Sequence, residues 1–372
     1  MKVLFVVSGT KRMAATRYRV YQYLGFLKKE KIEYDIFSIT SDPVTKMAIR
    51  SPEFNTIKRF GYYLIFSAER FLRFWAVFFK APRYDALFMQ RATFPFGLAG
   101  LLAGRCKRII FDIDDAIFMP DVPVNGFVSR LKAFVKEREV RDSLAVASRV
   151  IVENDYIKDY VSRFCGYIEK IPGPIDTDRY TVKEPPMSLR GPKLRPEAIL
   201  SKEIVLGWIG SPSTTAYLNI LNDVFPKIFS KYKNVRVVYI GAGKYGFRSE
   251  RITNKDWNYD TEVEELRKFD IGLMPMPDDR WTRGKLGCKM LQYMAVGVPT
   301  LASYTPTNAE IIKDGENGFL PKTGRDWVEK LSLLIDDGNL RRRIGMAGRK
   351  TVEGFCSVRG NAPRFIKTFS NI

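Results

Sequence analysis

The stretch GKLGCKMLQYMAVGVPTLAS at residues 284–303 decides the fold of this chain. Its apolar residues recur at helical spacing and are followed by a short apolar run, which predicts a helix that ends at Gly297 and then a buried strand. Lys285, Lys289 and the amide of Gln292 lie near the start of that helix. Free backbone N–H groups and the helix dipole favour an anion there, so the pattern suits a nucleotide diphosphate.

Strand-like runs alternate with helical patterns along the rest of the chain. The first series lies at residues 3–7, 34–38, 86–90, 108–112, 150–152 and 168–171, and the second at 204–209, 235–240, 271–274, 300–302 and 318–320. Residues 180–202, rich in proline and charge, have the composition of a linker between the two series. The alternation predicts an α/β protein made of two doubly wound halves, each with a parallel sheet.

Residues 284–303 resemble the donor-sugar half of the GT-B glycosyltransferases, specifically the retaining enzymes of family four (glycosyl transferases group 1). That family typically carries two glutamates separated by seven residues and followed by Ala-Met-Ala. Gly284 and Gln292 occupy the two positions here, so the glutamate pair is not intact. Residues 284–295 also resemble a subgroup pattern, Gly-Lys-Cys-x-x-Lys-x-Leu-Gln-Tyr-Met-Ala.

Other segments resemble the same family in the same order. They are AVASRVIVEND at residues 145–155, IPGPIDTDRY at 171–180 and IVLGWIGSPST at 204–214. The resemblance implies two Rossmann-like domains that face each other across a cleft. The N-terminal domain, residues 1–178, would bind the acceptor and be completed by a C-terminal helix at about 357–372. The C-terminal domain, residues 179–356, would bind a nucleotide-sugar donor.

The amino-acid composition excludes several catalytic mechanisms and kinds of metal site. The 372 residues include no histidine, which excludes a histidine base or nucleophile system and any histidine-ligated metal. The four cysteines are scattered without metal-ligand spacing, and we expect reduced thiols in a cytosolic protein. Neither a secretory signal nor a membrane-spanning stretch is expected. The net charge of +20 implies attraction to polyanions, with no choice among nucleic acid, acidic lipid and phosphorylated substrates.

In the C-terminal half, a glycine turn and a later acid are further donor-binding candidates. The candidates in the turn are Gly210, Ser211, Ser213 and Thr214. Glycine permits close backbone approach, and the hydroxyls can donate to phosphate, although a plain strand-to-helix turn has the same sequence. Asn308 and Glu310 follow the predicted strand. Glu310 suits either sugar hydroxyls, as the resemblance implies, or the N-terminal charge of a helix.

In the N-terminal half, polar residues follow three predicted strands. Asp114 and Asp115 follow the fourth strand and are the candidate catalytic acids, together with Lys289 on the donor side. They could bind a divalent metal, an acceptor hydroxyl or a developing positive charge, or simply be solvated. GT-B enzymes need no bound metal, so the resemblance implies no metal and no cofactor beyond the donor itself. Gly9, Arg19 and Arg91 are the candidate acceptor-binding residues, with packed or surface arginines as the alternative.

Residues 58–83 form a helical pattern of a different kind. Arg59, Arg70, Arg73 and Lys80 cluster on one face, and aromatic and aliphatic residues fill much of the rest. Such a helix suits an anionic membrane interface, with its bases toward the lipid head groups, or a domain helix packed on a sheet.

Together these features and the resemblance predict a metal-independent glycosyltransferase, and the resemblance alone implies that it is a retaining enzyme. It would move a sugar from a nucleotide sugar to a lipid-linked or glycan acceptor at the cytosolic face of a membrane, as a peripheral protein in polysaccharide biosynthesis that binds no nucleic acid. Two alternatives stay open: a sugar-nucleotide epimerase of the same fold, and a non-catalytic polyanion-binding protein.

Overall fold

The computed structural model describes residues 1–11, 13–50, 54–119, 127–182, 203–243 and 249–370. The chain divides into two compact units. Unit 1 comprises Met1–Pro174, Arg283–Leu286 and Asn361–Ile372, and unit 2 comprises Ile175–Thr282 and Gly287–Gly360. Residues 183–202, most of the predicted linker, lie outside the described residues. Residues 361–372 at the C-terminus therefore belong to the same unit as the N-terminal strands.

Unit 1 is built on a parallel sheet. Its strands are β1 (Lys2–Val7), β2 (Glu33–Ser38), β3 (Ala86–Gln90), β4 (Ile109–Ile113), β5 (Arg149–Val152) and β6 (Ile168–Lys170), in the order β2-β1-β3-β4-β5-β6. The strands β1, β3 and β4 are buried almost throughout, as expected when helices cover both faces of a sheet. The chain reverses its direction across the sheet between β1 and β3, and this switch point is where such sheets bind ligands.

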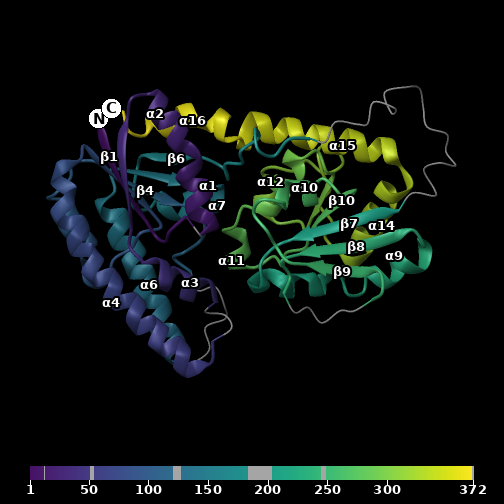
Figure 1. Cartoon of the computed structure of the whole chain (residues 1–372), viewed down its shortest axis with the longest axis horizontal. Helices are drawn as coiled ribbons and strands as arrows, with labels where there is room; N and C mark the ends of the chain where they lie inside the picture. Colours follow the sequence, from purple (N-terminus) through teal and green to yellow (C-terminus); the bar gives the residue numbers. More distant parts are fainter. Residues whose placement is uncertain (12, 51–53, 120–126, 183–202, 244–248, 371–372) are drawn as a thin grey trace. The chain divides into compact units, whose positions relative to one another are not determined.

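The helices of unit 1 cover the two faces of its sheet. They are α1 (Ala14–Arg19), η1 (Tyr21–Tyr23), α2 (Leu24–Lys29), α3 (Asp42–Arg50), α4 (Thr56–Lys80), η3 (Ala81–Arg83), η4 (Pro95–Gly97), α5 (Ala99–Leu102), α6 (Phe127–Val146), α7 (Asp155–Val161) and α16 (Val358–Lys367). Because crossover connections are right-handed, the reversal after β2 places α4 and α6 on the face opposite α1 and α2 (Figure 1). Helix α16, near the end of the chain, packs on the same face as α1 and α2. There Phe365 stacks on Tyr23 of η1, with 4.1 Å between the ring centres, and its ring centre lies 5.3 Å from that of Phe88 in β3.

Unit 2 repeats the same architecture. Its strands are β7 (Ile204–Ile209), β8 (Val235–Ile240), β9 (Ile252–Lys255), β10 (Ile271–Met274) and β11 (Thr300–Ala302), parallel and in the order β11-β10-β7-β8-β9. Its helices are η6 (Pro212–Leu221), α9 (Phe225–Lys231), α10 (Glu262–Leu266), α11 (Arg280–Arg283), α12 (Cys288–Ala295), α13 (Pro306–Ala309), α14 (Gly324–Asp336), α15 (Gly338–Thr351) and η7 (Val352–Cys356). The switch point here lies between β7 and β10.

The predicted fold class is confirmed, with two differences among the strands. Residues 318–320, a predicted strand, contribute only two isolated bridges, from Phe319 to Leu301 and from Gly318 to Asp314. Strand β9 was not predicted, because its sequence, Ile-Thr-Asn-Lys, offers a single apolar residue. It lies at the edge of its sheet, where an alternating or continuous apolar pattern is not needed.

Helix α4 exists as predicted, and part of its basic face packs on unit 1. The sequence left two interpretations open: bases that face anionic head groups, or a domain helix packed on a sheet. The side chain of Arg70 is 9% exposed and pairs with Glu139 of α6 at 2.5 Å. Arg73 is engaged by Glu69 at 2.8 Å and by the Ser38 carbonyl at 3.0 Å. These two arginines therefore attach the helix to unit 1.

Candidate functional site

A buried polar turn lies at the switch point of unit 1. A Cβ on Gly9, which follows β1, would stand 2.6 Å from Met13 Cγ, so a side chain there would displace Met13. The hydroxyl of Thr16 lies 3.3 Å from both the Gly9 carbonyl and Oε1 of Gln90. Within the described part of the chain, the Nε2 amide of the buried Gln90 has no hydrogen-bond partner. The turn thus places an unused donor beside the end of β3.

Arg19 is directed into the protein. Its Nε lies 3.2 and 3.1 Å from the two carboxylate oxygens of Asp112, and its Nη2 lies 2.5 Å from one of them. Nη1 donates to the Ile171 carbonyl at 2.8 Å. Burial alone would lower the pKa of Arg19, but the charge of Asp112 more than offsets it, so that pKa is raised. The residue that we expected to bind the acceptor instead ties α1 to β4 and to the chain after β6.

Arg91 brings together the two candidate acids. Its backbone has φ = 49°, a left-handed conformation that costs a non-glycine residue about 1–3 kcal/mol. Its backbone N–H donates to the Asp112 carbonyl at 3.0 Å, and its guanidinium forms ion pairs with both Asp114 and Asp115. Asp115 is the more accessible acid, with 22% of its side chain exposed against 8% for Asp114. Three predicted residues therefore meet at the ends of β3 and β4.

Glu153 belongs to the same cluster and was not predicted. It follows β5 and is buried. Burial raises its pKa well above the usual range, the nearby Arg19 opposes this, and the charges of Asp114 and Asp115 raise it further. An acid directly after a buried strand is the sequence signal that could have revealed it. Because its pKa is high, Glu153 keeps its proton under conditions in which an ordinary glutamate is ionised.

The acids of this cluster face arginines. Asp112 is held by Arg19, and Asp114 and Asp115 are held by Arg91. Among the residues that the structure describes, no group of three or more His, Cys, Asp and Glu side chains is placed to hold a metal ion. The cluster can therefore position a hydroxyl group through Asp115 while the arginines compensate its charge.

In unit 2, the turn after β7 is closely packed. A Cβ on Gly210 would stand 2.4 Å from the Trp208 ring and 2.7 Å from Cε of Lys289, and a Cβ on Gly241 would stand 2.4 Å from the Gly210 carbonyl. Gly241, after β8, also has φ = 75°. Only glycine fits here without displacing the lysine, so the turn and Lys289 form one arrangement.

Lys289 lies in the first turn of α12 and reaches the residues that follow β7. Its Nζ lies 3.1 Å from Oγ1 of Thr214 and 5.2 Å from the centre of the Trp208 ring. Ser211 and Ser213 share a hydrogen bond of 2.8 Å, and both are exposed. A cation and three hydroxyl groups thus surround the end of β7, beside the switch point of unit 2.

Gln292 is directed away from the surface. Its Nε2 donates to the Tyr180 hydroxyl at 3.1 Å and to Oε1 of Glu262 at 3.3 Å. Tyr180 and the indole N–H of Trp257 also donate to Glu262, which is buried. The amide predicted to lie at the donor site therefore helps to hold a buried carboxylate. Sequence reasoning missed Glu262, because its partners come from three separated segments.

The remaining donor candidates are dispersed. Asn308 is buried and donates to the Ser303 carbonyl at 2.8 Å, while its Oδ1 has no partner within the described residues. Glu310 follows the short helix α13 as its C-cap rather than beginning a helix, and it is partly exposed. Lys285 belongs to unit 1, because the chain from Arg283 to Leu286 packs there: a Cβ on Gly284 would stand 2.2 Å from Cβ of Ala116.

The chain resembles known proteins in sequence. Residues 193–351 match the family described as glycosyl transferases group 1, which supports the family for that part of the chain. A putative glycosyltransferase, EpsD of Bacillus subtilis, is 26% identical over 56% of this chain and 56% of its own length. The capsular polysaccharide biosynthesis glycosyltransferase CapM of Staphylococcus aureus is 26% identical over 42% of this chain and 43% of its own length. The chain thus matches about half the length of each relative.

Two solved structures share the fold over nearly the whole chain. HepE of Anabaena, in complex with UDP and glucose, has a TM-score of 0.66 and 15% identity, with 100% of both chains covered. A sucrose-phosphate synthase of Thermosynechococcus elongatus has a TM-score of 0.71 and 14% identity, with 99% of this chain and 98% of that one covered. Together with the two parallel sheets, this likeness shows the GT-B fold.

Proposed function

We propose that the protein is a glycosyltransferase that moves a sugar from a nucleotide sugar to a lipid-linked or glycan acceptor at the cytosolic face of a membrane. The observation that carries the proposal is the position of Lys289, beside the hydroxyl-bearing turn that follows β7 at the switch point of unit 2. The family match covers this same region. UDP in the complex of HepE and the capsular role in the name of CapM support a nucleotide-sugar donor and a polysaccharide product.

Transfer breaks the bond between the anomeric carbon and the diphosphate and forms a bond from that carbon to an acceptor oxygen. The leaving diphosphate gains negative charge, and the acceptor hydroxyl loses its proton to a phosphate oxygen. Lys289 and the N–H groups at the start of α12 would stabilise the developing charge. Retention of the anomeric configuration is proposed from the resemblance to family four.

In unit 1, we assign the acceptor to the cluster around Arg91. Asp115 is its most accessible carboxylate and would accept a hydrogen bond from the acceptor hydroxyl. Asp114 and the left-handed backbone at Arg91 would fix the guanidinium between the two acids. Chemistry of this kind needs neither a metal nor a further cofactor, because the protein supplies the cation on the donor side.

The first test is nucleotide binding. Lys289→Ala should weaken UDP binding by about 1.5–3 kcal/mol, roughly ten- to 150-fold, because it removes a charge-assisted contact. Isothermal titration calorimetry measures this directly. Lys313→Ala, an exposed lysine elsewhere in unit 2, is the matched control and should bind UDP as the wild type does. Unchanged affinity in Lys289→Ala would remove the donor assignment.

A further inference from the structure

Helix α4 exposes its apolar face. Ile57, Phe60, Leu64, Leu72 and Phe79 lie within one stripe of the helix by their spacing. Their exposed fractions run from 57% for Leu64 to 83% for Ile57. A helix that only packed on a sheet would turn such a stripe inward. This stripe is therefore unexplained by the folding of unit 1.

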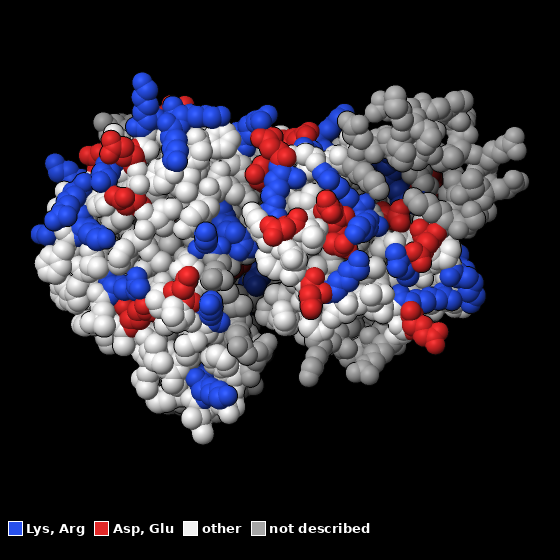
Figure 2. All heavy atoms as spheres, viewed as in Figure 1, with Lys and Arg blue, Asp and Glu red and all other residues white. Residues whose placement is uncertain are grey.

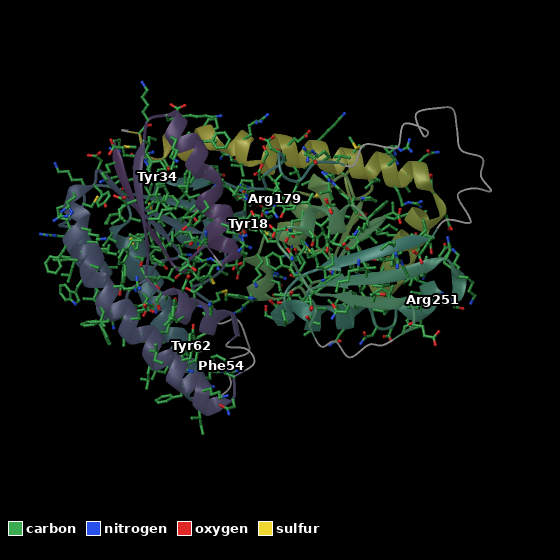
Figure 3. All side chains as sticks on the ribbon, viewed as in Figure 1. Tyr18, Tyr34, Phe54, Tyr62, Arg179 and Arg251 are labelled. Carbon is green, nitrogen blue, oxygen red and sulfur yellow. The ribbon has the colours of Figure 1, made fainter. Side chains whose placement is uncertain are left out.

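The opposite face of α4 is the one that packs. Phe74 and Val77 are fully buried there, and Tyr62 is nearly so, with its ring 6.3 Å from that of Phe54 at the start of the helix (Figure 3). Arg70 lies on this face, where it donates to the Thr93 carbonyl at 3.2 and 2.9 Å in addition to its ion pair with Glu139. The helix is thus held by arginines and aromatic rings on one side, and its outer side is exposed among the described residues of unit 1.

The apolar surface continues beyond α4. Leu131, Phe134 and Val135 of the neighbouring helix α6 are about half exposed or more. Phe96 in η4 is 87% exposed, has φ = 57° and lies 6.4 Å from the ring of Phe71 on α4. A large side chain held in a left-handed conformation and in solvent indicates a constraint that folding alone does not explain. We call the exposed apolar residues of α4, α6 and η4 together the outer surface of unit 1 (Figure 1 labels α4 and α6).

Positive charge accompanies the outer surface. The exposed bases on α4 and α6 include Lys58, Arg130, Lys132 and Arg138. Lys132 lies 4.0 Å above the Tyr63 ring and thereby links α6 to α4. Among the described residues of α4, the only acid is Glu69, which is paired with Arg73. Figure 2 shows broad areas of unit 1 without charged residues, with blue Lys and Arg and fewer red Asp and Glu side chains around them.

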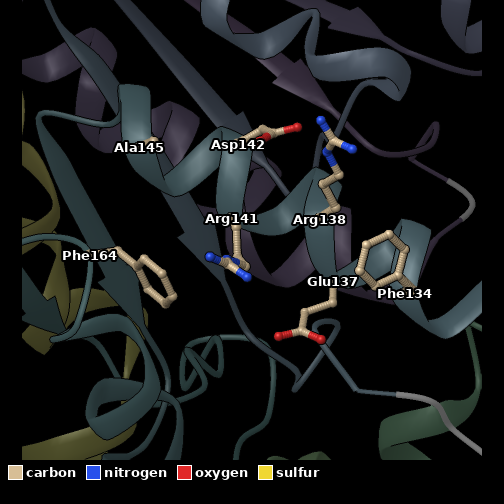
Figure 4. A pocket seen from close by; sticks show the side chains of 7 residues that line it. All are labelled: Phe134, Glu137, Arg138, Arg141, Asp142, Ala145 and Phe164. Atoms are coloured by element: carbon tan, nitrogen blue, oxygen red, sulfur yellow. The ribbon is translucent and has the colours of Figure 1, made fainter.

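A hollow of about 370 Å³ adjoins the apolar residues of α6 (Figure 4). It is lined by Phe134, Glu137, Arg138, Arg141, Asp142, Ala145 and Phe164. Arg141 lies 5.7 Å from the centre of the Phe164 ring. Two arginines, of which Arg138 is one, and two acids leave the hollow balanced in formal charge, so the positive excess of the region comes from Lys58, Arg130 and Lys132.

We propose that the outer surface of unit 1 inserts into the interfacial region of a membrane that contains anionic phospholipid. The aromatic and aliphatic side chains would lie at the boundary between head groups and acyl chains, and the exposed bases would contact the head groups. A lipid surface fits better than a protein groove, because the apolar residues form a broad convex stripe along a helix of 25 residues rather than a few anchors. The proposal specifies the membrane surface of the proposed function and does not depend on the identity of the donor.

Vesicle flotation of the full chain tests this proposal. The wild type should float with vesicles of phosphatidylcholine and phosphatidylglycerol and bind pure phosphatidylcholine at least tenfold less. Phe60→Gln/Leu64→Gln/Leu72→Gln should lower the bound fraction at least tenfold. Leu333→Gln/Met346→Gln, which changes two exposed apolar residues of unit 2, should float as the wild type does. Because the three changed side chains are exposed, the variant should keep the melting temperature and UDP affinity of the wild type.

Trp75 provides a second readout, since it lies on the outer face of α4 and is 36% exposed. Anionic vesicles should shift the tryptophan emission of the wild type to the blue, and Trp75→Phe should lose that shift. Equal flotation of the triple variant and the wild type would overturn the proposal. A vesicle-independent dimer that the triple variant dissociates would also overturn it, because the surface would then join two copies of the chain. Lost UDP binding with intact flotation would instead contradict only the proposed function.

Discussion

Glu153 shows most clearly, at the scale of single residues, what burial does to charge in unit 1. Its sequence context predicts only an acid after a strand. Its pKa rises first because the fold buries it, and the charges of Asp114 and Asp115 after β4 raise it further, while Arg19 of α1 opposes the rise; these residues are far apart in sequence. The ion pairs of Arg91 with Asp114 and Asp115 likewise join separate segments of the chain. The sequence predicted Arg91, Asp114 and Asp115 as site residues, but not that the arginine would bridge both acids.

The raised pKa of Glu153 makes stability depend on pH. Below its unfolded pKa, about 4.3, Glu153 is protonated in both states and adds no pH dependence. Above that value the unfolded state loses the proton and the folded state keeps it, so stability falls by up to about 1.4 kcal/mol per pH unit until the folded pKa is reached. Glu153→Gln should remove this decline and be more stable than the wild type at pH 8.

Urea unfolding at pH 5, 6, 7 and 8 measures this effect. The Glu169→Gln variant changes a carboxylate that is 38% exposed and paired with Arg364, and it should keep the slope of the wild type. Parallel pH dependence in Glu153→Gln and the wild type would contradict the assignment of a protonated Glu153.

At the scale of secondary-structure elements, the sequence predicted which helices exist better than it predicted which of their faces pack inward. The spacing of apolar and basic residues in α4 predicted a helix with two faces. It did not decide which face packs, because an arginine can be buried when a carboxylate such as Glu139 meets it, and that carboxylate lies on α6. Likewise α12 was predicted from its pattern, but the inward direction of Gln292 depends on Tyr180 and Glu262.

The orientation of α4 predicts unequal effects of its bases. Arg70→Ala should destabilise the protein by about 3–5 kcal/mol, because it leaves Glu139 buried without its ion-pair partner. Lys58→Ala, on an exposed part of the same helix, should change the free energy of unfolding by less than about 0.5 kcal/mol. Urea unfolding compares the two variants. If Arg70→Ala were as stable as Lys58→Ala, the buried pair would not hold the helix.

A side chain at Gly210, in the turn after β7, should disturb both Lys289 and the buried ring of Trp208. Gly210→Ala should push Lys289 aside, because the added Cβ would stand 2.7 Å from its Cε, and UDP affinity should fall about tenfold. Gly324→Ala is the matched control, since a Cβ there meets nothing within 4 Å. Calorimetry measures the UDP affinity of both variants, and circular dichroism checks their folding. Unchanged affinity in Gly210→Ala would show that the position of Lys289 does not matter for UDP binding.

At the scale of the whole molecule, the fold was the feature best predicted from the sequence. Alternating strand and helix patterns sufficed for two parallel α/β units, because buried parallel strands produce continuous apolar runs that polar sites do not disturb. Lys285, a donor-binding candidate from the sequence, lies in unit 1 for a topological reason. The chain between α11 and α12 packs on unit 1 at Gly284, and no local pattern records such a crossing. Within the described part of the chain, none of the helices has the length and hydropathy to span a bilayer.

Turnover of a nucleotide sugar tests the central claim most directly. The measurement is release of nucleoside diphosphate from a panel of UDP- and GDP-sugars, in the presence of a membrane lipid extract and excess EDTA. We predict release that depends on the extract, persists in the chelator and falls at least tenfold in Lys289→Ala but not in Lys313→Ala. Equal release by Lys289→Ala and the wild type, or no release from any donor, would contradict the account.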